Sequence, residues 1–388
     1  METNLDLIIT ANHASLTADF RLLDSAGSQV AYRQTDFKLV PVSRRQALFD
    51  LCDYLDLYVE PGGEEEAVAE TGVLIAGQIL GEEILLRFWE PEHQRTLRIQ
   101  LPGAADEDNH LAAALARVPW EIARPRMEEP SLAERNLLVR IVHDMKEPAT
   151  EALPLARDEA LRVLFVFAES RESNPLAARL ERGELLRLFE SEIYPNRLVS
   201  ADFLTHGVTR ERLQAQIADR GGYHIVHWSG HGHLDLLELA RPGGAQDLLS
   251  GEELLDLFVE SGGFIPRLFF LSACHSGDIL RVKDWNDFFA VAEFAQSRKG
   301  AKNAKEITLE SRPGYTGTAH ALLQGGVGSV VAMRYAVGDD YARELAVEFY
   351  RALLAHSQPK SAAAALTMAR RSLLDPGKHD LARFAACD

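Results

Sequence analysis

The second half of the chain alternates short apolar runs with longer amphipathic segments. The short runs have the length and continuous apolar character of buried strands, and they cover residues 161–168, 198–204, 224–227, 268–271 and 329–333. The longer segments repeat apolar residues every three or four positions, as helices do, at residues 175–193, 210–220, 250–260, 341–356 and 361–374. This alternation predicts an α/β domain over residues 156–388, with a mostly parallel sheet and helices on both faces.

The first part of the chain has a different pattern, and we treat residues 1–155 as a separate α+β region. Partial alternation of apolar and polar residues predicts half-buried antiparallel strands at residues 5–10, 17–23 and 30–37. A further strand is expected at 96–101, and helices are expected at 43–59, 67–89 and 111–117. The region is either a partner-docking module or a scaffold for the second domain.

Composition is that of a soluble globular protein with about two domains in 388 residues. The 58 acidic and 41 basic side chains give a formal net charge of −17, which disfavours direct binding to nucleic acids because such binding needs basic patches. The N-terminus lacks the pattern of a secretory signal peptide, and no apolar run reaches the length of a membrane span. We therefore expect a cytoplasmic protein that contacts no membrane.

Three widely spaced cysteines, Cys52, Cys274 and Cys387, do not make a disulfide framework. A reducing compartment would keep them as thiols. Only Cys274 stands in a glycine-rich turn, so Cys52 and Cys387 are expected to be structural.

Two glycine-rich turns follow two of the predicted strands. Residues 227–232 are His-Trp-Ser-Gly-His-Gly, and residues 271–277 are Leu-Ser-Ala-Cys-His-Ser-Gly. Because parallel strands end at the same edge of a sheet, His231 and Cys274 are expected side by side, 43 residues apart in the sequence. A thiol beside an imidazole is the minimum equipment for thiol catalysis. A lone buried cysteine or histidine is more often structural, but two of them at matching strand ends favour catalysis.

A long segment, residues 278 to about 314, follows the second turn and interrupts the alternation. It carries Arg298, Lys299, Lys302 and Lys305 in an otherwise acidic chain. Connections of this length inside compact domains are usually functional or disordered. Two alternatives stay open here: a regulatory or self-cleaved loop, and an ordinary solvated loop.

The two turns resemble those of the CHAT family, the caspase-like cysteine peptidases of clan CD. A histidine roughly 50 residues upstream of the cysteine is also a caspase pattern. Further matches lie at residues 118–121, 161–168, 325–332 and 337–354, and the similarity runs from about residue 72 to the end. The resemblance implies a caspase-like fold, in which the N-terminal region is a pseudo-caspase or a scaffold. The family usually ends with another apolar strand, which is not expected before Asp388, so the chain is either a fragment or lacks that strand.

The resemblance also implies roles for named residues. Cys274 would be the nucleophile, and His231 would be the base that later returns the proton to the leaving amine. The backbone N–H groups of Gly232 and Cys274 would form the oxyanion hole. No cofactor is implied.

Several histidines crowd the region: His224, His227, His231, His233 and His275. His224 and His227 are expected to point into packing, and His231 is expected on the exposed turn. Three histidines near a cysteine are also compatible with zinc. A structural zinc site usually draws closely paired ligands from two short turns, so we expect no metal here.

In caspases, the end of the first strand and the loop after the fourth line the primary specificity pocket. The corresponding residues here are Glu169, Asp339 and Asp340, together with Ser272 two residues before the cysteine. An acidic lining would favour cleavage after arginine or lysine. Alternatively, Asp339 and Asp340 merely cap the helix that follows them.

The resemblance implies a cysteine endopeptidase that acts on protein substrates in regulated proteolysis, often in prokaryotic antiphage defence or programmed cell death. An activating partner or regulatory domain is expected, and homo-oligomerisation is left open. The alternatives are a catalytically silent scaffold for protein–protein contacts and a zinc-binding regulatory module.

Overall fold

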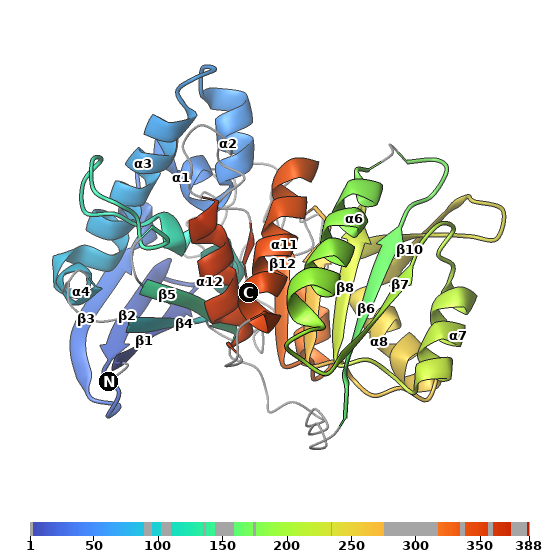
Figure 1. Cartoon of the computed structure of the whole chain (residues 1–388). Coiled ribbons are helices and arrows are strands. Elements are labelled where there is room, and N and C mark those ends of the chain that lie inside the picture. The colour runs from blue at the N-terminus through green and yellow to red at the C-terminus, as the bar shows by residue number, and fades with distance from the viewer. Residues whose placement is uncertain are drawn as a thin grey trace. The chain divides into compact units, whose positions relative to one another are not determined.

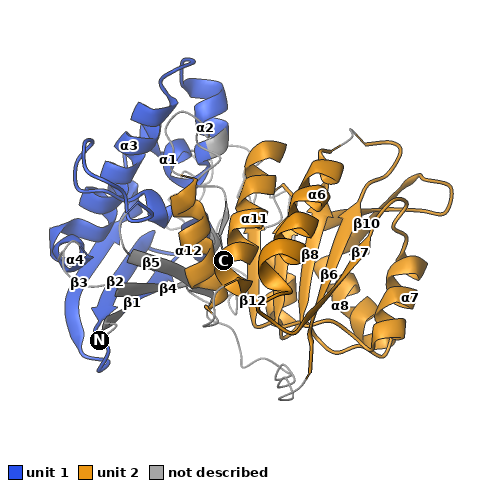
Figure 2. Cartoon of the chain, viewed as in Figure 1, with its two compact units in different colours: residues 1–144, 279–316 blue, residues 145–278, 317–388 orange. Residues whose placement is uncertain are grey.

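The computed structural model describes residues 3–88, 95–101, 110–134, 137–143, 159–173, 176–233, 235–274, 317–333, 338–355, 360–373 and 386–387. The chain forms two compact units, residues 1–144 with 279–316 and residues 145–278 with 317–388 (Figure 2). The domain boundary expected near residue 155 and the whole insertion expected at 278–314 lie outside the described residues. Each unit is described below by itself.

Unit 1 contains a five-stranded sheet with the strand order β3-β2-β1-β4-β5. Its strands are β1 (Thr3–Asn12), β2 (Thr17–Leu23), β3 (Gln29–Asp36), β4 (Arg95–Leu101) and β5 (Leu137–His143). The first three pair antiparallel, as the alternating pattern predicted. β4 and β5 add to β1 in parallel, which makes the sheet mixed. β5 was not predicted.

The helices of unit 1 are α1 (Val42–Phe49), α2 (Leu51–Tyr58), α3 (Glu64–Leu74), α4 (Gly81–Phe88) and α5 (His110–Arg117). Two of the helical segments predicted in unit 1 are divided into shorter helices, whereas the helix predicted at 111–117 is present as α5. The helix predicted over 43–59 is broken at Asp50, where φ is −150° and ψ is 68°. Arg117 stabilises this break because its guanidinium pairs with the Asp50 carboxylate at 3.3 Å and donates to the Phe49 carbonyl oxygen at 2.7 Å.

The segment predicted to be helical over 67–89 is also divided. After α3 the backbone widens into a π-helical turn, η2 (Ile75–Leu80), and Gly81 then adopts φ 76° at the start of α4. Glycine is the residue that accepts this left-handed conformation without strain. The 3-10 turn η3 (Trp120–Ile122) follows α5, and the fully buried Trp120 packs edge-on against Phe20 of β2.

Unit 2 contains a six-stranded sheet with the order β13-β12-β11-β8-β6-β7. Its strands are β6 (Leu161–Ala168), β7 (Val199–Leu204), β8 (Ile225–Gly230), β11 (Leu268–Ser272), β12 (Ser329–Met333) and β13 (Ala386–Cys387). The five long strands are parallel, as predicted. The final strand, expected to be missing, is present in a short form: β13 pairs antiparallel with β12 over two residues.

Helices cover both faces of this sheet (Figure 1). On one face lie α6 (Ala178–Leu188) with its π-helical extension η4 (Phe189–Ile193), α11 (Asp339–Leu354) and α12 (Ala362–Ser372). On the other face lie α7 (Arg210–Arg220), α8 (Gly251–Glu260) and α10 (Thr318–Gln324). Thr209 caps α7, and Ser250 with Glu253 forms a capping box on α8. Each face therefore has its own hydrophobic core.

A β-hairpin that the sequence pattern did not predict lies between β8 and α8. It consists of β9 (Leu236–Ala240) and β10 (Gln246–Ser250), paired antiparallel. Leu237 and Leu239 are fully buried in the core on the α7 and α8 face. The hairpin therefore belongs to the body of unit 2.

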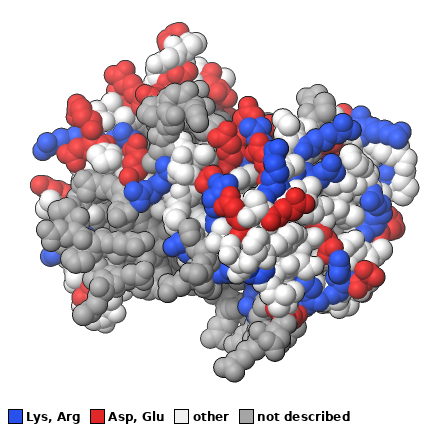
Figure 3. All heavy atoms as spheres, in the orientation of Figure 1, with Lys and Arg blue, Asp and Glu red and all other residues white. Residues whose placement is uncertain are grey.

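Charge is mixed on the surface of unit 2. On the face in Figure 3, acidic and basic side chains are interspersed over the described part of this unit. The net negative charge of the chain therefore does not form one continuous field there. Among the described residues, no helix combines the length and apolar character needed to cross a membrane.

Candidate active site

Small polar residues occupy the ends of two central strands of unit 2. Side chains alternate between the two faces of a sheet. On β11, Phe270 packs in the core beneath α6 and α11, whereas Leu271 packs in the core on the opposite face. Ser272 therefore faces α6 and α11, and it stands in register with Ser229 of β8. Two residues earlier on the same strands, the side chains on this face are the rings of His227 and Phe270. The smaller serine side chains leave room for a pocket.

The same alternation continues past the strand ends. His231 follows Ser229 by two residues, and Cys274 follows Ser272 by two residues. Both side chains are half-buried, and Cys274 is a free thiol. The expectation that adjacent parallel strands bring this histidine and this cysteine to one place agrees with the geometry, because both line one pocket.

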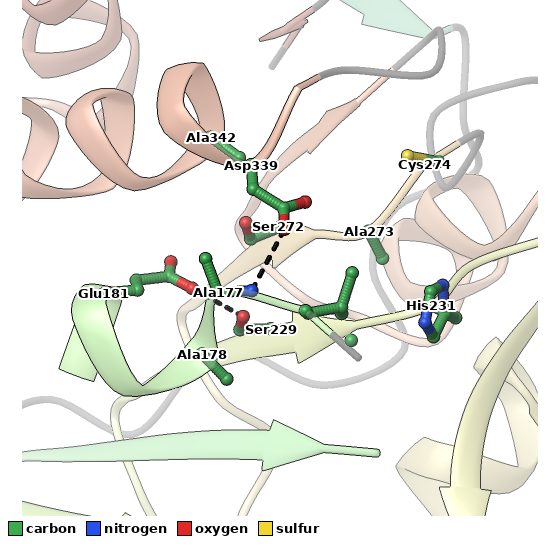
Figure 4. A pocket seen from close by; sticks show the side chains of 12 residues that line it. Ala177, Ala178, Glu181, Ser229, His231, Ser272, Ala273, Cys274, Asp339 and Ala342 are labelled. Carbon is green, nitrogen blue, oxygen red and sulfur yellow. Dashed lines mark hydrogen bonds between the residues drawn. The ribbon is translucent and has the colours of Figure 1, made fainter. Parts of the chain in front are cut away.

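The pocket has a volume of about 440 Å³, counting the open space at its mouth. Figure 4 shows His231 and Cys274 at one end of it and Glu181 with Ser229 at the other. Its walls come from the start of α6, the ends of β8 and β11, and the start of α11. The full lining is Leu176, Ala177, Ala178, Glu181, Ser229, Gly230, His231, Ser272, Ala273, Cys274, Asp339 and Ala342.

Two glycines allow the close approach of backbones at this edge. A Cβ atom on Gly232 would lie 2.4 Å from the carbonyl oxygen of Cys274 and 3.0 Å from the Cβ of Ala273. A Cβ atom on Gly230 would lie 2.7 Å from the carbonyl oxygen of Ala168. These distances are too short for any side chain. Glycine is therefore required for the His231 segment to pack directly on the Cys274 segment.

The β9–β10 hairpin holds the His231 segment from the other side. The N–H of Glu238 donates to the carbonyl oxygen of His231 at 3.0 Å, and Gly232 forms an isolated antiparallel bridge with Leu237. The Glu238 carboxylate is buried, and it accepts hydrogen bonds from the N–H of Ser170 at 3.1 Å and the hydroxyl of Ser173 at 2.5 Å. One hairpin therefore positions the candidate base and the loop that follows β6.

The residues that the sequence assigned to substrate binding separate into two groups. Ser272 and Asp339 line the pocket, whereas Glu169 and Asp340 do not. The Glu169 carboxylate accepts from the N–H of Leu176 at 3.0 Å. The Asp340 side chain is 77% exposed and pairs with Arg343 at 2.6 Å.

Asp339 connects the two helices that form the pocket wall. Its carboxylate accepts a hydrogen bond from the N–H of Ala177 at 3.0 Å, just before α6 begins (Figure 4). The N-cap of α11 is Gly338, which has no side chain to cap the helix. Asp339 thus lies in the first turn of α11, where a negative charge is favourable, while its hydrogen bond reaches to the neighbouring segment.

Glu181 is a pocket residue that the sequence analysis missed. It is 5% exposed, and its Oε2 accepts a hydrogen bond from the hydroxyl of Ser229 at 2.5 Å. Its Oε1 lies 3.1 Å from Nε2 of His227. A signal was present in the sequence: Glu181 shares the buried stripe of α6 with Leu185 and Leu188, four and seven positions later. A charged residue in such a stripe needs a buried partner.

His227 lies beneath the pocket and is fully buried, as the sequence predicted. Its ring stacks on Phe270 with a centroid distance of 5.0 Å, and it contacts Phe165 and Tyr350 at 5.3 and 5.7 Å. Burial, and after it the negative charge of Glu181, raises the pKa of the Tyr350 hydroxyl well above its usual value. The polar pair Glu181–His227 is therefore embedded in an aromatic layer.

The other histidines of the region have separate environments. His224 is buried, its Nδ1 accepts from the N–H of Arg162 at 3.0 Å, and burial lowers its pKa. His233 is exposed, and His275 lies outside the described residues. Within the described ranges, no group of three or more histidine, cysteine, aspartate or glutamate side chains is arranged to hold a metal ion.

A family model described as the CHAT domain matches residues 110–385. The chain belongs to the CHAT-domain family. The match begins at residue 110, later than the residue near 72 at which the resemblance was expected to start, and it covers α5, η3 and nearly all of unit 2. The predicted fold class is confirmed: a caspase-like α/β fold with a central parallel sheet between helices, together with an N-terminal α+β region.

Two solved structures are similar to this CHAT-domain chain. One is the Arg-specific cysteine proteinase gingipain R, with a TM-score of 0.44 and 12% identity over 82% of this chain and 65% of that one. The other is separase of Saccharomyces cerevisiae in complex with securin, with a TM-score of 0.48 and 9% identity over 99% of this chain and 30% of that one. The chain thus spans less than two thirds of either protein. No curated protein matches it in sequence.

Proposed function

We propose that the chain is a cysteine endopeptidase in which Cys274 is the nucleophile and His231 is the general base. The observation that carries this proposal is that both side chains line one pocket, at the ends of two adjacent parallel strands. A thiol is mostly protonated at neutral pH and becomes an effective nucleophile beside a base. The pocket next to the pair gives a substrate side chain a place to bind.

The reaction has two halves. In the first, His231 takes the thiol proton, and the sulfur of Cys274 attacks the carbonyl carbon of the scissile amide. The backbone N–H groups of Gly232 and Cys274 donate to the oxyanion of the tetrahedral intermediate. His231 gives its proton to the leaving amine, and the acyl group stays on sulfur as a thioester. In the second half, His231 takes a proton from water, the hydroxide attacks the thioester, and the acid leaves as the thiol is restored.

The two serines of the pocket are poorer nucleophiles than Cys274. The hydroxyl of Ser229 donates to the Glu181 carboxylate and not to a histidine. The hydroxyl of Ser272 makes no hydrogen bond within the described part of the chain. A serine needs a hydrogen-bonded base to attack an amide. These contacts favour a thiol peptidase over a serine hydrolase.

The proposal extends to protein substrates that are cut after arginine or lysine. Asp339 lines the pocket and supplies a negative charge, and Ser272 beside it supplies a hydroxyl. A carboxylate favours a cationic side chain by charge pairing. Glu169 and Asp340 were also assigned to this role from the sequence, but they lie off the pocket lining, so only Ser272 and Asp339 of the four assigned residues support the preference.

Regulation follows from the family resemblance. We expect activity to await an activating partner or a regulatory domain, within a prokaryotic defence or cell-death pathway in the cytoplasm. The surface loops of a protein substrate would reach the pocket, which is open at its mouth. These parts of the proposal rest on the resemblance alone.

Labelling with an electrophilic peptide tests the proposal. The probe is a peptidyl acyloxymethyl ketone with arginine or lysine beside the ketone, and mass spectrometry identifies the labelled residue. We expect labelling of Cys274 in the wild type, none in Cys274→Ala and at least about tenfold slower labelling in His231→Ala. His233→Ala, which changes an exposed histidine nearby, is the matched control and should label at the wild-type rate. Equal labelling of wild type and His231→Ala would favour the silent scaffold.

A further inference from the structure

Glu181 is a buried carboxylate that pairs with no lysine or arginine among the described residues. Other glutamates of the same helical segment have one: Glu184 pairs with Arg343 at 3.3 Å, and Glu192 pairs with Arg351 at 3.2 Å. Both of those glutamates are partly exposed, whereas Glu181 is 5% exposed. Burying a charge without a counter-charge is costly. The buried glutamate of this segment, which has no lysine or arginine beside it among the described residues, is therefore the one that lines the pocket.

The partner of Glu181 in the core does not neutralise it. Nε2 of His227 lies 3.1 Å from the carboxylate, and Nδ1 has no hydrogen-bond partner within the described residues. A ring protonated on both nitrogens would leave a buried N–H without an acceptor, against the aromatic layer. We therefore assign a single ring proton to Nε2, donated to Glu181. The carboxylate then receives hydrogen bonds from two neutral donors, His227 and Ser229.

The pocket also has unused hydrogen-bonding capacity beside this charge. A carboxylate offers about four lone-pair sites, and the two hydrogen bonds of Glu181 occupy one on each oxygen. Ser272 is 8% exposed, lines the same pocket, and its hydroxyl has no partner within the described residues. This hydroxyl is a second polar group on the pocket lining, independent of the carboxylate, and it can accept a hydrogen bond from a group that enters from outside.

We propose that Glu181 determines the substrate specificity of this site by binding the cationic end of an arginine or lysine side chain at the floor of the pocket. The inference rests on the proposed peptidase function. The scissile bond would lie at the His231 and Cys274 end of the pocket, and the side chain before it would reach toward Glu181, with Ser272 as a further acceptor. An incoming cation supplies a counter-charge that no lysine or arginine among the described residues provides.

Asp339 has a secondary role in this arrangement. One of its oxygens is held by the N–H of Ala177, and the residue is exposed, so its charge is screened by water. Glu181 lies in a drier environment, where the same charge interacts more strongly. Glu181 should therefore contribute more to the preference for cations than Asp339.

Binding of a side-chain mimic tests this inference without requiring catalysis. The probes are propylguanidinium, which copies the end of arginine, and propylurea, its uncharged counterpart of the same shape. With the full chain, titration followed by NMR should show tighter binding of propylguanidinium than of propylurea. Glu181→Gln should weaken propylguanidinium binding by about 10- to 100-fold and leave propylurea binding nearly unchanged. Asp339→Asn should weaken it by less than about tenfold.

Controls separate loss of charge from loss of structure. Glu190→Gln changes an exposed glutamate of the same helical segment and should bind as the wild type does. Glu181→Asp keeps the negative charge and should retain a preference for propylguanidinium over propylurea. If Glu181→Gln binds propylguanidinium as tightly as the wild type, or if the wild type binds both probes equally, the inference is wrong.

Hydrolysis distinguishes this inference from the proposed function. Cys274→Ala should abolish cleavage of arginyl peptides while it leaves propylguanidinium binding intact. If propylguanidinium binding depends on Glu181 but Cys274 reacts with no electrophile, the cation site stands and the proposed peptidase function is wrong. If cleavage of arginyl peptides depends on Cys274 but is unchanged in Glu181→Gln, the peptidase function stands and the role of Glu181 is wrong.

Discussion

Gly232 lies directly against the carbonyl oxygen of Cys274, at a distance that leaves no room for a Cβ atom. The contact joins the segment after β8 to the segment after β11. It therefore fixes the backbone next to the candidate base relative to the backbone of the candidate nucleophile. Two residues far apart in the sequence are held together by a glycine that carries no chemistry of its own.

Gly232→Ala should reduce catalysis strongly while the fold survives. The added methyl group would lie 2.4 Å from the Cys274 carbonyl oxygen, so the two segments must move apart. A displacement of this size in an active site costs about 10²-fold in rate. We expect kcat/KM on a peptide substrate to fall by at least about 10²-fold. Gly183→Ala is the control, since that helical glycine has open space around it and the change should raise the free energy of unfolding by roughly 0.5–1 kcal/mol.

Glu238→Gln should destabilise the chain, and more at neutral than at acidic pH. Burial acts to raise the pKa of Glu238, but hydrogen bonds from Ser173, Gln246 and Ser170 outweigh it and leave the pKa below its usual value. A lowered pKa stabilises the fold above the unfolded-state pKa, and this contribution is lost as pH falls through the folded-state pKa. We expect a loss of about 1–3 kcal/mol at pH 7 in urea unfolding. A difference between variant and wild type that stays constant down to pH 3 would contradict this.

His320→Gln should make stability less dependent on pH between 6.5 and 4. Burial lowers the pKa of His320 from 6.5 to about 4, so the folded state keeps the ring neutral while the unfolded state protonates it. Stability is therefore complete above pH 6.5 and declines as pH falls toward 4, by up to ~3 kcal/mol. Thermal unfolding across this range should show a smaller decline in the variant. His233→Gln, at an exposed histidine, should leave the wild-type dependence intact.

The basic segment after Cys274 provides a test of self-cleavage. Arg298, Lys299 and Lys302 are suitable sites for a peptidase that cuts after basic residues, although they lie outside the described residues. We expect intact-mass analysis of the active enzyme to find two fragments, and Cys274→Ala to give one uncut chain. An active enzyme that remains a single chain would remove the self-cleavage hypothesis and leave a solvated or regulatory loop.

The sequence predicted the five parallel strands and five helical segments of unit 2 because their signals are local, but it did not predict α10. β6 and β12 have the predicted bounds, since continuous apolar runs mark buried parallel strands. The β9–β10 hairpin was missed because its apolar residues show no clear alternation, and Leu237 and Leu239 pack only through tertiary contacts. The break at Asp50 likewise depends on Arg117, which lies far away in the sequence.

Some residues of the candidate site are likewise marked by the local sequence, whereas others depend on tertiary packing. His231, Gly232 and Cys274 were identifiable because each stands in a glycine-rich turn after an apolar run. Glu181 was missed: its place in the apolar stripe of α6 indicated burial, but its partners Ser229 and His227 reach it only through packing of α6 on the sheet. Conversely, Glu169 is near the expected place in sequence, but its carboxylate is used by the N–H of Leu176. Strand ends can be read locally, whereas the helix residue that covers them cannot.

The reactivity of Cys274 toward iodoacetamide at pH 7 tests the central claim most directly, because this small reagent needs no substrate pocket and no known sequence preference. The thiolate is the reactive form, so a base beside the thiol accelerates alkylation. We predict that Cys274 reacts much faster than a free cysteine and that His231→Ala slows it by about tenfold or more, whereas His233→Ala does not. Equal alkylation rates in the wild type and His231→Ala would contradict the thiol–imidazole pair.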